Sequence, residues 1–291
     1  MRQLAARGDE VLALDAAGAG ETVPGTGLPL VGADVAEPGL WARLDAFAPD
    51  AVVHAAAHPG GKSLAEPSED VRTNALGSMR VFEWCARETR PVVYLSSSIV
   101  YGDQPPGPIG ETARVSPGTV YGVAKLACEG WLRVLGEGRG LPWTVLRLFA
   151  TYGAGHKPSL QQGIVNIMLT QMLRGDRVVV RGSLERRRDL VYVDDAAGAI
   201  VAAIDRDAAR GHVINVGTGV EVTIGGMIAS LARALGRDPA AMTIVEEPGT
   251  VGDPPGNLAD ISRMRNLLGY DPRFTLDAGL DAMVSRLPSV S

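Results

Sequence analysis

Short apolar segments alternate with helical segments through the first half of the chain, and this order constrains the fold more than any other feature. Strands that are buried on both faces and joined by helices form a parallel sheet with right-handed crossovers. The sequence therefore predicts a doubly wound α/β domain, whose ligands bind at the carboxyl ends of the strands. The expected strands are residues 10–14, 51–54, 92–96 and 144–148, and the expected helices are residues 39–47, 69–88 and 120–137.

The regular alternation of apolar strands and helices ends near residue 150. A loop rich in Gly, Pro and Ser covers residues 153–163, and a loop rich in Pro and Gly covers residues 246–256. We therefore expect a first domain over residues 1–150 and a smaller C-terminal substrate-binding lobe over residues 151–291, with segments that return to the first domain. In this lobe we expect helices at 164–174 and 224–235, strands at 177–181 and 212–216, a strand and helix within 190–204, and two short terminal helices.

The composition excludes several classes of protein. A formal charge of 28 − 33 = −5 argues against nonspecific binding to nucleic acid or to anionic membranes. No apolar run approaches the roughly 20 residues that a membrane-spanning helix needs. Cys85 and Cys128 form no disulfide framework, which indicates a reducing, cytoplasmic location. Neither they nor the four histidines (54, 58, 156 and 212) have the spacing of metal ligands, so we expect structural histidines and no metal site.

Tyr121 and Lys125 lie four residues apart, on one face of an expected helix. A phenol with a pKa of about 10 is a weak base at neutral pH. A neighbouring ammonium favours the phenolate and lowers that pKa, which suits the pair to proton transfer. Tyr-x-x-x-Lys also arises by chance on many helices, but lysine occurs in this chain only at positions 62, 125 and 157.

Ser96, Ser97 and Ser98 lie where the expected strand 92–96 ends, at the edge of the sheet where a ligand would bind. A serine-rich turn that bonds its own backbone explains one or two of them. A hydroxyl placed beside Tyr121 would instead orient a substrate hydroxyl through a hydrogen bond.

Seven segments, taken together, carry a specific resemblance to a known family. They are residues 52–56 (VVHAA), 74–77 (NALG), 95–103 (LSSSIVYGD), 121–125 (YGVAK), 146–153 (LRLFATYG), 188–195 (RDLVYVDD) and 214–219 (INVGTG). The chain resembles the extended short-chain dehydrogenase/reductase family, in the NAD-dependent epimerase/dehydratase branch typified by UDP-galactose 4-epimerase. The resemblance implies a Rossmann-like first domain, NAD as cofactor and a nucleotide-activated sugar as substrate.

The resemblance also implies roles for individual residues. Ser97 matches the catalytic hydroxyl, Tyr121 the acid/base, and Lys125 the residue that lowers the pKa of the tyrosine and binds the nicotinamide ribose. Ser97, Ser98 and Arg188 match positions that bind substrate. A planar, permanently charged guanidinium at Arg188 suits a diphosphate, whereas the neighbouring Arg186 and Arg187 are explained by a solvated basic turn.

The cofactor side of the resemblance involves further positions. Asp15 matches the acidic residue that accepts hydrogen bonds from the adenosine ribose and favours NAD over NADP. Two explanations account equally well for alanine at positions 55 and 56: contact with the cofactor, or simple packing of small residues after a strand. With Tyr121 and Lys125, the expected cofactor-binding residues are Asp15, Asp34, Val35, Ala55, Ala56 and Asn74.

The chain departs from the family pattern in two places. Ala150 stands where the family has an asparagine that helps to hold the nucleotide diphosphate or the sugar. The Gly-rich phosphate-binding turn should lie about 20 residues before Asp15, which is before Met1. Residues 1–8 instead indicate the last turns of a helix that ends at Gly8. Either the gene start is misplaced, which we favour, or the first strand and the turn are absent and NAD is bound weakly or not at all.

The expected activity is epimerisation of the sugar at C4 through a 4-keto intermediate. Dehydratases and decarboxylases of this branch carry acidic residues just after the catalytic hydroxyl, where this chain has Ser98 and Ile99. A 4-ketosugar reductase or dehydratase of the same family, or a non-catalytic protein that senses NAD or a sugar nucleotide, remain alternatives. The resemblance also implies a homodimer through the helices 69–88 and 120–137. The sequence does not identify the nucleotide or the sugar.

Overall fold

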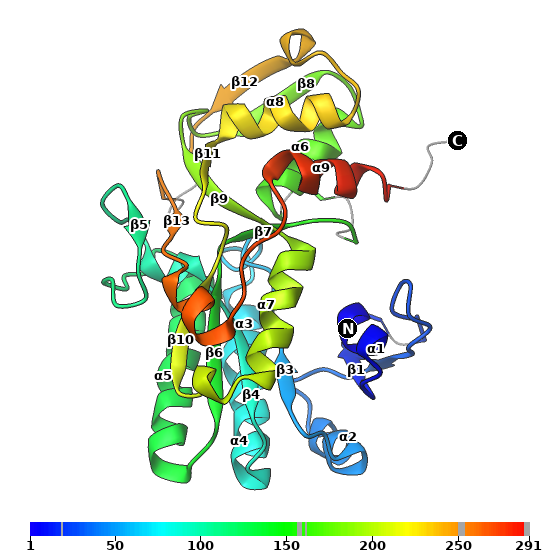
Figure 1. Cartoon of the computed structure of the whole chain (residues 1–291), viewed down its shortest axis with the longest axis vertical. Coiled ribbons are helices and arrows are strands. Elements are labelled where there is room, and N and C mark those ends of the chain that lie inside the picture. Colours follow the sequence, from blue (N-terminus) through cyan, green and yellow to red (C-terminus); the bar gives the residue numbers. More distant parts are fainter. Residues whose placement is uncertain (19, 156–158, 161, 250–253, 288–291) are drawn as a thin grey trace. The chain divides into compact units, whose positions relative to one another are not determined.

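The computed structural model describes residues 1–18, 20–155, 159–160, 162–249 and 254–287 (Figure 1). The chain divides into two compact units, each built from three stretches. The first unit consists of Met1–Ser96, Val120–Leu146 and Ala197–Val213, and the second consists of Ser97–Thr119, Arg147–Ala196 and Ile214–Ser291.

A four-stranded sheet with the order β10-β6-β4-β3 organises the first unit. Its strands are β3 (Val52–His54), β4 (Val92–Ser97), β6 (Trp143–Leu148) and β10 (His212–Val216). β3 and β4 are parallel, with Val52 opposite Val92 and His54 opposite Tyr94. The predicted α/β fold with parallel strands is confirmed, and each of these strands lies within one residue of its expected bounds.

One face of this sheet is covered by α2 (Leu40–Phe47), α4 (Ser78–Glu88) and α5 (Val120–Arg139) (Figure 1). Val92 and Tyr94 of β4 pack into the same apolar cluster as Phe82 and Trp84 of α4 and Leu132 of α5. Val93 points to the opposite face and is also buried. Burial on both faces explains why this strand is a continuous apolar run rather than an alternating one.

The N-terminal part of the chain begins with α1 (Arg2–Arg7), which ends at Gly8 in the left-handed conformation, as predicted. β1 (Ala13–Asp15) follows and pairs in parallel with β2 (Leu30–Gly32). Within the described residues these two strands form a sheet of their own and do not pair with the four-stranded sheet.

The expected helix 69–88 consists of three consecutive elements. They are α3 (Pro67–Asp70), the π-helix η1 (Val71–Gly77) and α4. Gly77 at the end of η1 allows close approach of another segment, since a Cβ there would lie 2.6 Å from the Cγ2 of Val35. A π-helix shifts the faces of the elements on either side of it and occurs often at functional sites.

In the second unit, a three-stranded sheet has the order β11-β9-β7. β9 (Arg187–Tyr192) is parallel to β7 (Ala150–Tyr152) and antiparallel to β11 (Glu221–Thr223). Two further parallel pairs join β12 (Thr243–Glu247) to β8 (Arg177–Arg181) and β13 (Leu258–Ala259) to β5 (Pro108–Ile109). The remaining helical elements are η2 (Ser98–Tyr101), α6 (Ile164–Met172), α7 (Val193–Asp205), η3 (Asp207–Ala209), α8 (Ile224–Ala234), η4 (Pro239–Ala241), η5 (Met264–Leu268) and α9 (Leu276–Val284).

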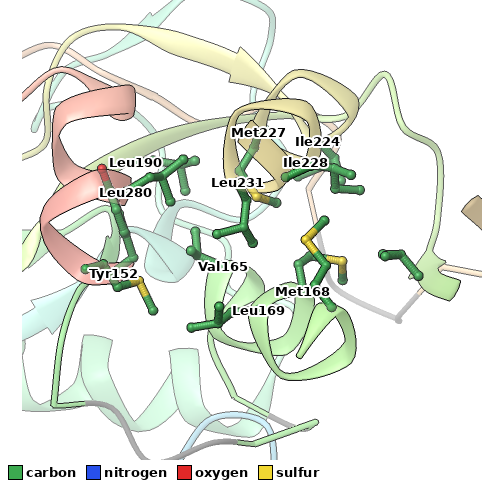
Figure 2. Packing of buried hydrophobic residues seen from close by; sticks show 14 of the residues in the cluster. Tyr152, Val165, Met168, Leu169, Leu190, Ile224, Met227, Ile228, Leu231 and Leu280 are labelled. Carbon is green, nitrogen blue, oxygen red and sulfur yellow. The ribbon is translucent and has the colours of Figure 1, made fainter. Parts of the chain in front are cut away.

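Figure 2 shows the apolar core of the second unit, where α6, α8 and α9 pack their side chains together. Met168, Met172, Met227 and Met283 are all at most 2% exposed in this core. Unbranched methionine side chains fill irregular space between helices. α8 begins at Thr223, whose hydroxyl accepts a hydrogen bond from the Gly226 amide at 3.0 Å. Across the part of the chain that the structure describes, no helix has the length and apolarity needed to cross a membrane.

Candidate active site

The carboxyl end of β4 and the helix α5 are joined by two hydrogen bonds. Lys125 Nζ donates to the Leu95 carbonyl at 2.8 Å, and Ser96 Oγ donates to Glu129 Oε1 at 2.5 Å. Lys125 and Glu129 are four residues apart on one helix face, and Tyr121 lies one turn before Lys125. These contacts fix α5 against the strand directly before Ser97.

The three serines that end β4 have three different partners. Ser96 bonds Glu129, whereas Ser97 ends the strand and caps η2, where its Oγ accepts a long hydrogen bond from the Ile99 amide at 3.4 Å. Ser98 Oγ accepts from Asn257 Nδ2 at 2.9 Å. Of the three serines, only Ser97 is explained by a turn in which the side chain bonds the neighbouring backbone. Its long hydrogen bond from the Ile99 amide is weak, so the Ser97 hydroxyl is available for a ligand.

Lys125 is almost completely buried and lies above two aromatic rings. Its Nζ is 4.7 Å from the ring centroid of Tyr94 and 5.5 Å from that of Tyr121. Burial lowers the pKa of Lys125 to about 8, while Cys128, Asp70 and Glu129 act in the opposite direction. The side chain therefore remains mostly an ammonium at neutral pH.

In the chain on its own, the pKa of Tyr121 lies above its ordinary value although Lys125 is close to its ring. Burial and then the charge of Asp70 raise the pKa of Tyr121 to about 12. The Lys125 ammonium is directed at the Leu95 carbonyl, so it lies over the Tyr121 ring and does not bond the phenol oxygen in any described contact. An additional positive charge is needed to favour the phenolate.

Several residues expected on the cofactor side surround the π-helix η1. Val35 packs on Gly77, and Asp34 Oδ2 accepts from Arg72 Nη1 at 2.8 Å. Although burial alone would raise the pKa of Asp34, the Ala36 amide and the Arg72 guanidinium lower it. Asn74 is fully buried in η1 and bonds the backbone of His58. The structure thus places Asp34 and Val35, which follow β2, against η1, the element that carries Asn74.

Asp15, Ala55 and Ala56 lie at the carboxyl ends of strands. Asp15 ends β1 and is exposed, with Oδ1 accepting from the Ala17 amide at 2.7 Å. Its backbone carbonyl accepts from the Ala33 amide, which places it close to Asp34. Ala55 and Ala56 follow β3 and are exposed. An exposed carboxylate after one strand and small side chains after another fit the adenosine ribose and the phosphates of a dinucleotide.

Arg188 is buried in β9 of the second unit, beside Asp189. The Asp189 carboxylate accepts from the Thr218 amide and hydroxyl, from the Gly219 amide and from the Ala259 amide. The Asp189 amide donates to the Asn257 carbonyl at 2.8 Å, while the Asn257 side chain reaches Ser98. Within this unit, Asn257 therefore connects Ser98 to Asp189, the neighbour of Arg188 in β9.

Among the histidines, His54 is structural as expected. It is buried, its Nε2 lies 2.8 Å from Ser78 Oγ, and its ring stacks on Tyr94. Burial and then Lys125 lower the pKa of His54 to about 3, so it is neutral. His156 and Lys157 lie outside the described residues. No group of three or more His, Cys, Asp or Glu side chains that could hold a metal ion occurs in the described ranges.

Comparison with known proteins identifies the family. The pattern of the NAD dependent epimerase/dehydratase family matches residues 1–217. The chain belongs to this family. It is 32% identical over 254 residues to the UDP-glucose 4-epimerase of Mycolicibacterium smegmatis, across 86% of this chain and 80% of that protein.

Solved structures of epimerases are also similar to this member of the family. The UDP-glucose 4-epimerase of Thermotoga maritima, solved with UDP-glucose, has a TM-score of 0.89 and 28% identity over 98% of this chain and 92% of that one. The UDP-glucose 4-epimerase of Thermus thermophilus, solved with NAD, has a TM-score of 0.87 and 28% identity over 98% of this chain and 93% of that one. The chain is therefore a Rossmann-like enzyme of the epimerase/dehydratase family with NAD as its cofactor.

Proposed function

We propose that the chain catalyses C4 epimerisation of a nucleotide-activated hexose through a 4-keto intermediate. The observation that carries this proposal is the junction of α5 with β4, where the Lys125 bond to Leu95 holds Tyr121 and Lys125 at the strand end that continues into Ser97. This set contains a phenol, a buried cation and a hydroxyl, the groups that oxidation and reduction of an alcohol require.

In the proposed reaction, Ser97 orients the sugar 4-hydroxyl and Tyr121 takes its proton as hydride leaves C4. The 4-keto sugar then turns over, receives hydride on its other face, and recovers the proton from Tyr121. When bound, NAD accepts and returns the hydride and contributes the positive charge that favours the Tyr121 phenolate. Lys125 would supply a second cation and a donor to a ribose hydroxyl.

An epimerase is favoured over a dehydratase by the residues after Ser97. Elimination of water needs an acid and a base near the sugar beyond those that oxidise C4. Ser98 is a hydroxyl already bonded by Asn257, and Ile99 has no ionisable group. We propose UDP-hexoses as the first substrates to test, since UDP-glucose 4-epimerases are among the chain's relatives. Arg188 would bind the diphosphate and Ser98 the sugar.

We also propose the division of labour that the sequence predicts: residues 1–150 bind NAD and contribute Ser97, Ser98 and Tyr121 to the sugar, and residues 151–291 form the substrate-binding lobe. A homodimer through α3, α4 and α5 is supported by three exposed valines on η1 and α5: Val71, Val123 and Val134 are 54%, 55% and 56% exposed. Cys85 and Cys128 are both free thiols, which supports a reducing, cytoplasmic location.

The proposal is tested by NMR of UDP-glucose incubated with the protein and NAD. We expect UDP-galactose to accumulate to equilibrium without net formation of NADH. Tyr121→Phe should reduce the rate by about 10²- to 10⁴-fold, as expected for loss of a general acid/base. Net consumption of NADH with a keto sugar would favour a reductase, and a fully active Tyr121→Phe would contradict the mechanism.

A further inference from the structure

The loop formed by residues 55–66 lies against Tyr121. A Cβ built on Gly60 would be 3.2 Å from Cγ and 3.3 Å from Cδ1 of the Tyr121 ring. The loop folds tightly on itself, since the Lys62 amide bonds the Pro59 carbonyl at 2.9 Å and the Ser63 amide bonds the Gly60 carbonyl at 3.3 Å. The position of this loop therefore bears directly on the environment of the phenol.

Two side chains from α3 and η1 hold this loop. Asn74 Oδ1 accepts from the His58 amide at 2.7 Å, and Asn74 Nδ2 donates to the His58 carbonyl at 3.2 Å and to Asp70 Oδ2 at 2.9 Å. Ser63, itself buried, bonds the same oxygen of Asp70 through its hydroxyl and also approaches the Pro59 carbonyl. We call Ser63, Asp70 and Asn74 the loop clamp.

The loop clamp is continuous with α5. The Cys128 thiol lies 3.1 Å from the Asn74 carbonyl, and Cys128 is seven residues after Tyr121 on the same helix. η1 is thus bonded to α5 on one side and to the loop on the other. Tyr121 is held between the loop and the helix that carries it.

Asp70 is unusual within this arrangement because it is a completely buried carboxylate. Both of its side-chain hydrogen bonds, from Ser63 and Asn74, go to Oδ2, and Oδ1 has no hydrogen-bond partner within the described residues. A buried carboxylate with an unsatisfied oxygen is costly. Serine and asparagine could hold the loop with less cost, so the charge itself calls for a function.

We propose that Asp70 and Asn74 are positioning residues that hold the loop 55–66 against Tyr121, and that the buried Asp70 carboxylate acts on the phenol as well as on the loop. The catalytic meaning of this role rests on the proposed function. Asp70 from α3 and Tyr94 from β4 interact electrostatically with Tyr121, and the Lys125 ammonium lies over its ring. The loop that packs on Tyr121 carries His58, Lys62 and Glu66. Burial and then the charge of Asp70 raise the pKa of Tyr121, which agrees with a role for this carboxylate.

The clamp is tested by amide hydrogen exchange in residues 55–66 of the full chain. Ser63→Ala and Asn74→Ala should each speed exchange there roughly tenfold, because each removes buried hydrogen bonds to the loop. The matched control is Glu137→Gln, which replaces an exposed carboxylate on α5 and should leave exchange in residues 55–66 unchanged. Unchanged exchange in both clamp variants would overturn the clamp.

The charge is tested by the ultraviolet absorbance of the Tyr121 phenolate, measured as the difference between each protein and its Tyr121→Phe counterpart. Asp70→Asn retains the shape and an acceptor for Ser63, and its Tyr121 phenolate should form at a lower pH than in the wild type. Glu137→Gln should not shift it. An unshifted titration in a folded Asp70→Asn would overturn the role of the charge and leave Asp70 a structural residue.

Neither measurement uses turnover. If the wild-type chain epimerises no sugar nucleotide, the proposed function fails while exchange and absorbance still decide the clamp. If Asp70→Asn does not fold, Ser63→Ala still tests the clamp, and Asp70→Glu, which keeps the charge, should then fold and restore wild-type titration of Tyr121. A folded Asp70→Glu variant whose Tyr121 phenolate forms at a lower pH than in the wild type would overturn the proposal.

Discussion

Replacing Lys125 by Met should leave the fold stable while turnover is lost. Lys125 is 2% exposed, and burial lowers its pKa from 10.5 to about 8. A lowered pKa means that the folded chain holds the ammonium at a free-energy cost relative to the unfolded chain. With about 1.36 kcal/mol for each pKa unit, the difference 10.5 − 8 corresponds to a cost of about 3 kcal/mol at neutral pH.

Methionine removes this cost but also removes the hydrogen bond to the Leu95 carbonyl. Leaving that carbonyl without its partner costs about 1 to 3 kcal/mol. The two contributions partly cancel, so Lys125→Met should have a free energy of unfolding about 0 to 2 kcal/mol above the wild-type value at neutral pH. Turnover should nevertheless fall by at least about 10²-fold, because the ammonium above the Tyr121 ring is lost.

The sign of the pH dependence provides a second check. Between pH 8 and 10.5 the folded chain releases the Lys125 proton while the unfolded chain still binds it, so wild-type stability rises with pH relative to Lys125→Met. Urea denaturation of both proteins across this range measures the difference, with Arg133→Met, an exposed cation on α5, as control. Destabilisation of Lys125→Met by more than about 3 kcal/mol, or parallel pH profiles, would refute the reasoning.

Three further predictions concern other parts of the site. Because burial lowers the pKa of His54 to about 3, the unfolded chain binds a proton that the folded chain excludes, and the free energy of unfolding should fall as the pH drops from 6.5 towards 3. Urea denaturation should show a smaller fall for His54→Gln than for the wild type. An equal fall in both proteins would contradict this role of His54. Arg188→Lys should raise the KM for the nucleotide sugar about tenfold with kcat little changed, since lysine cannot bind a diphosphate through two parallel bonds; initial rates in which only kcat falls would speak against diphosphate binding. Asp15→Asn should reduce the preference for NAD over NADP about tenfold in a fluorescence titration, and an unchanged preference would exclude Asp15 as the ribose ligand.

The elements that the sequence predicted well are those with strong local signals. Apolar runs bounded by helices identify β3, β4 and β6, and Gly8 marks the end of α1. The short strands β2, β7 and β13 have two or three residues each and exist because a partner strand pairs with them. The sequence alone contains no periodic signal for such strands, and none for the change from α- to π-helix at η1.

Within the candidate site, residue types were easier to predict than their electrostatics. The spacing of Tyr121 and Lys125 indicates a shared helix face, but not that the ammonium bonds the Leu95 carbonyl of another strand. The raised pKa of Tyr121 depends on tertiary burial and on Asp70, which sequence reasoning did not single out. Asp70 and Glu129 each lie four residues from an expected site residue, Asn74 and Lys125, and that helical spacing was the available signal.

The most direct test of the account is the fate of the C4 hydrogen when UDP-glucose is converted in deuterated water. We expect UDP-galactose with protium retained at C4, seen by NMR, and no net NADH, because hydride leaves and returns within one active site while only the Tyr121 proton exchanges. Deuterium at C4 of the product, or no conversion by the full chain with NAD, would contradict epimerisation by oxidation and reduction at Tyr121.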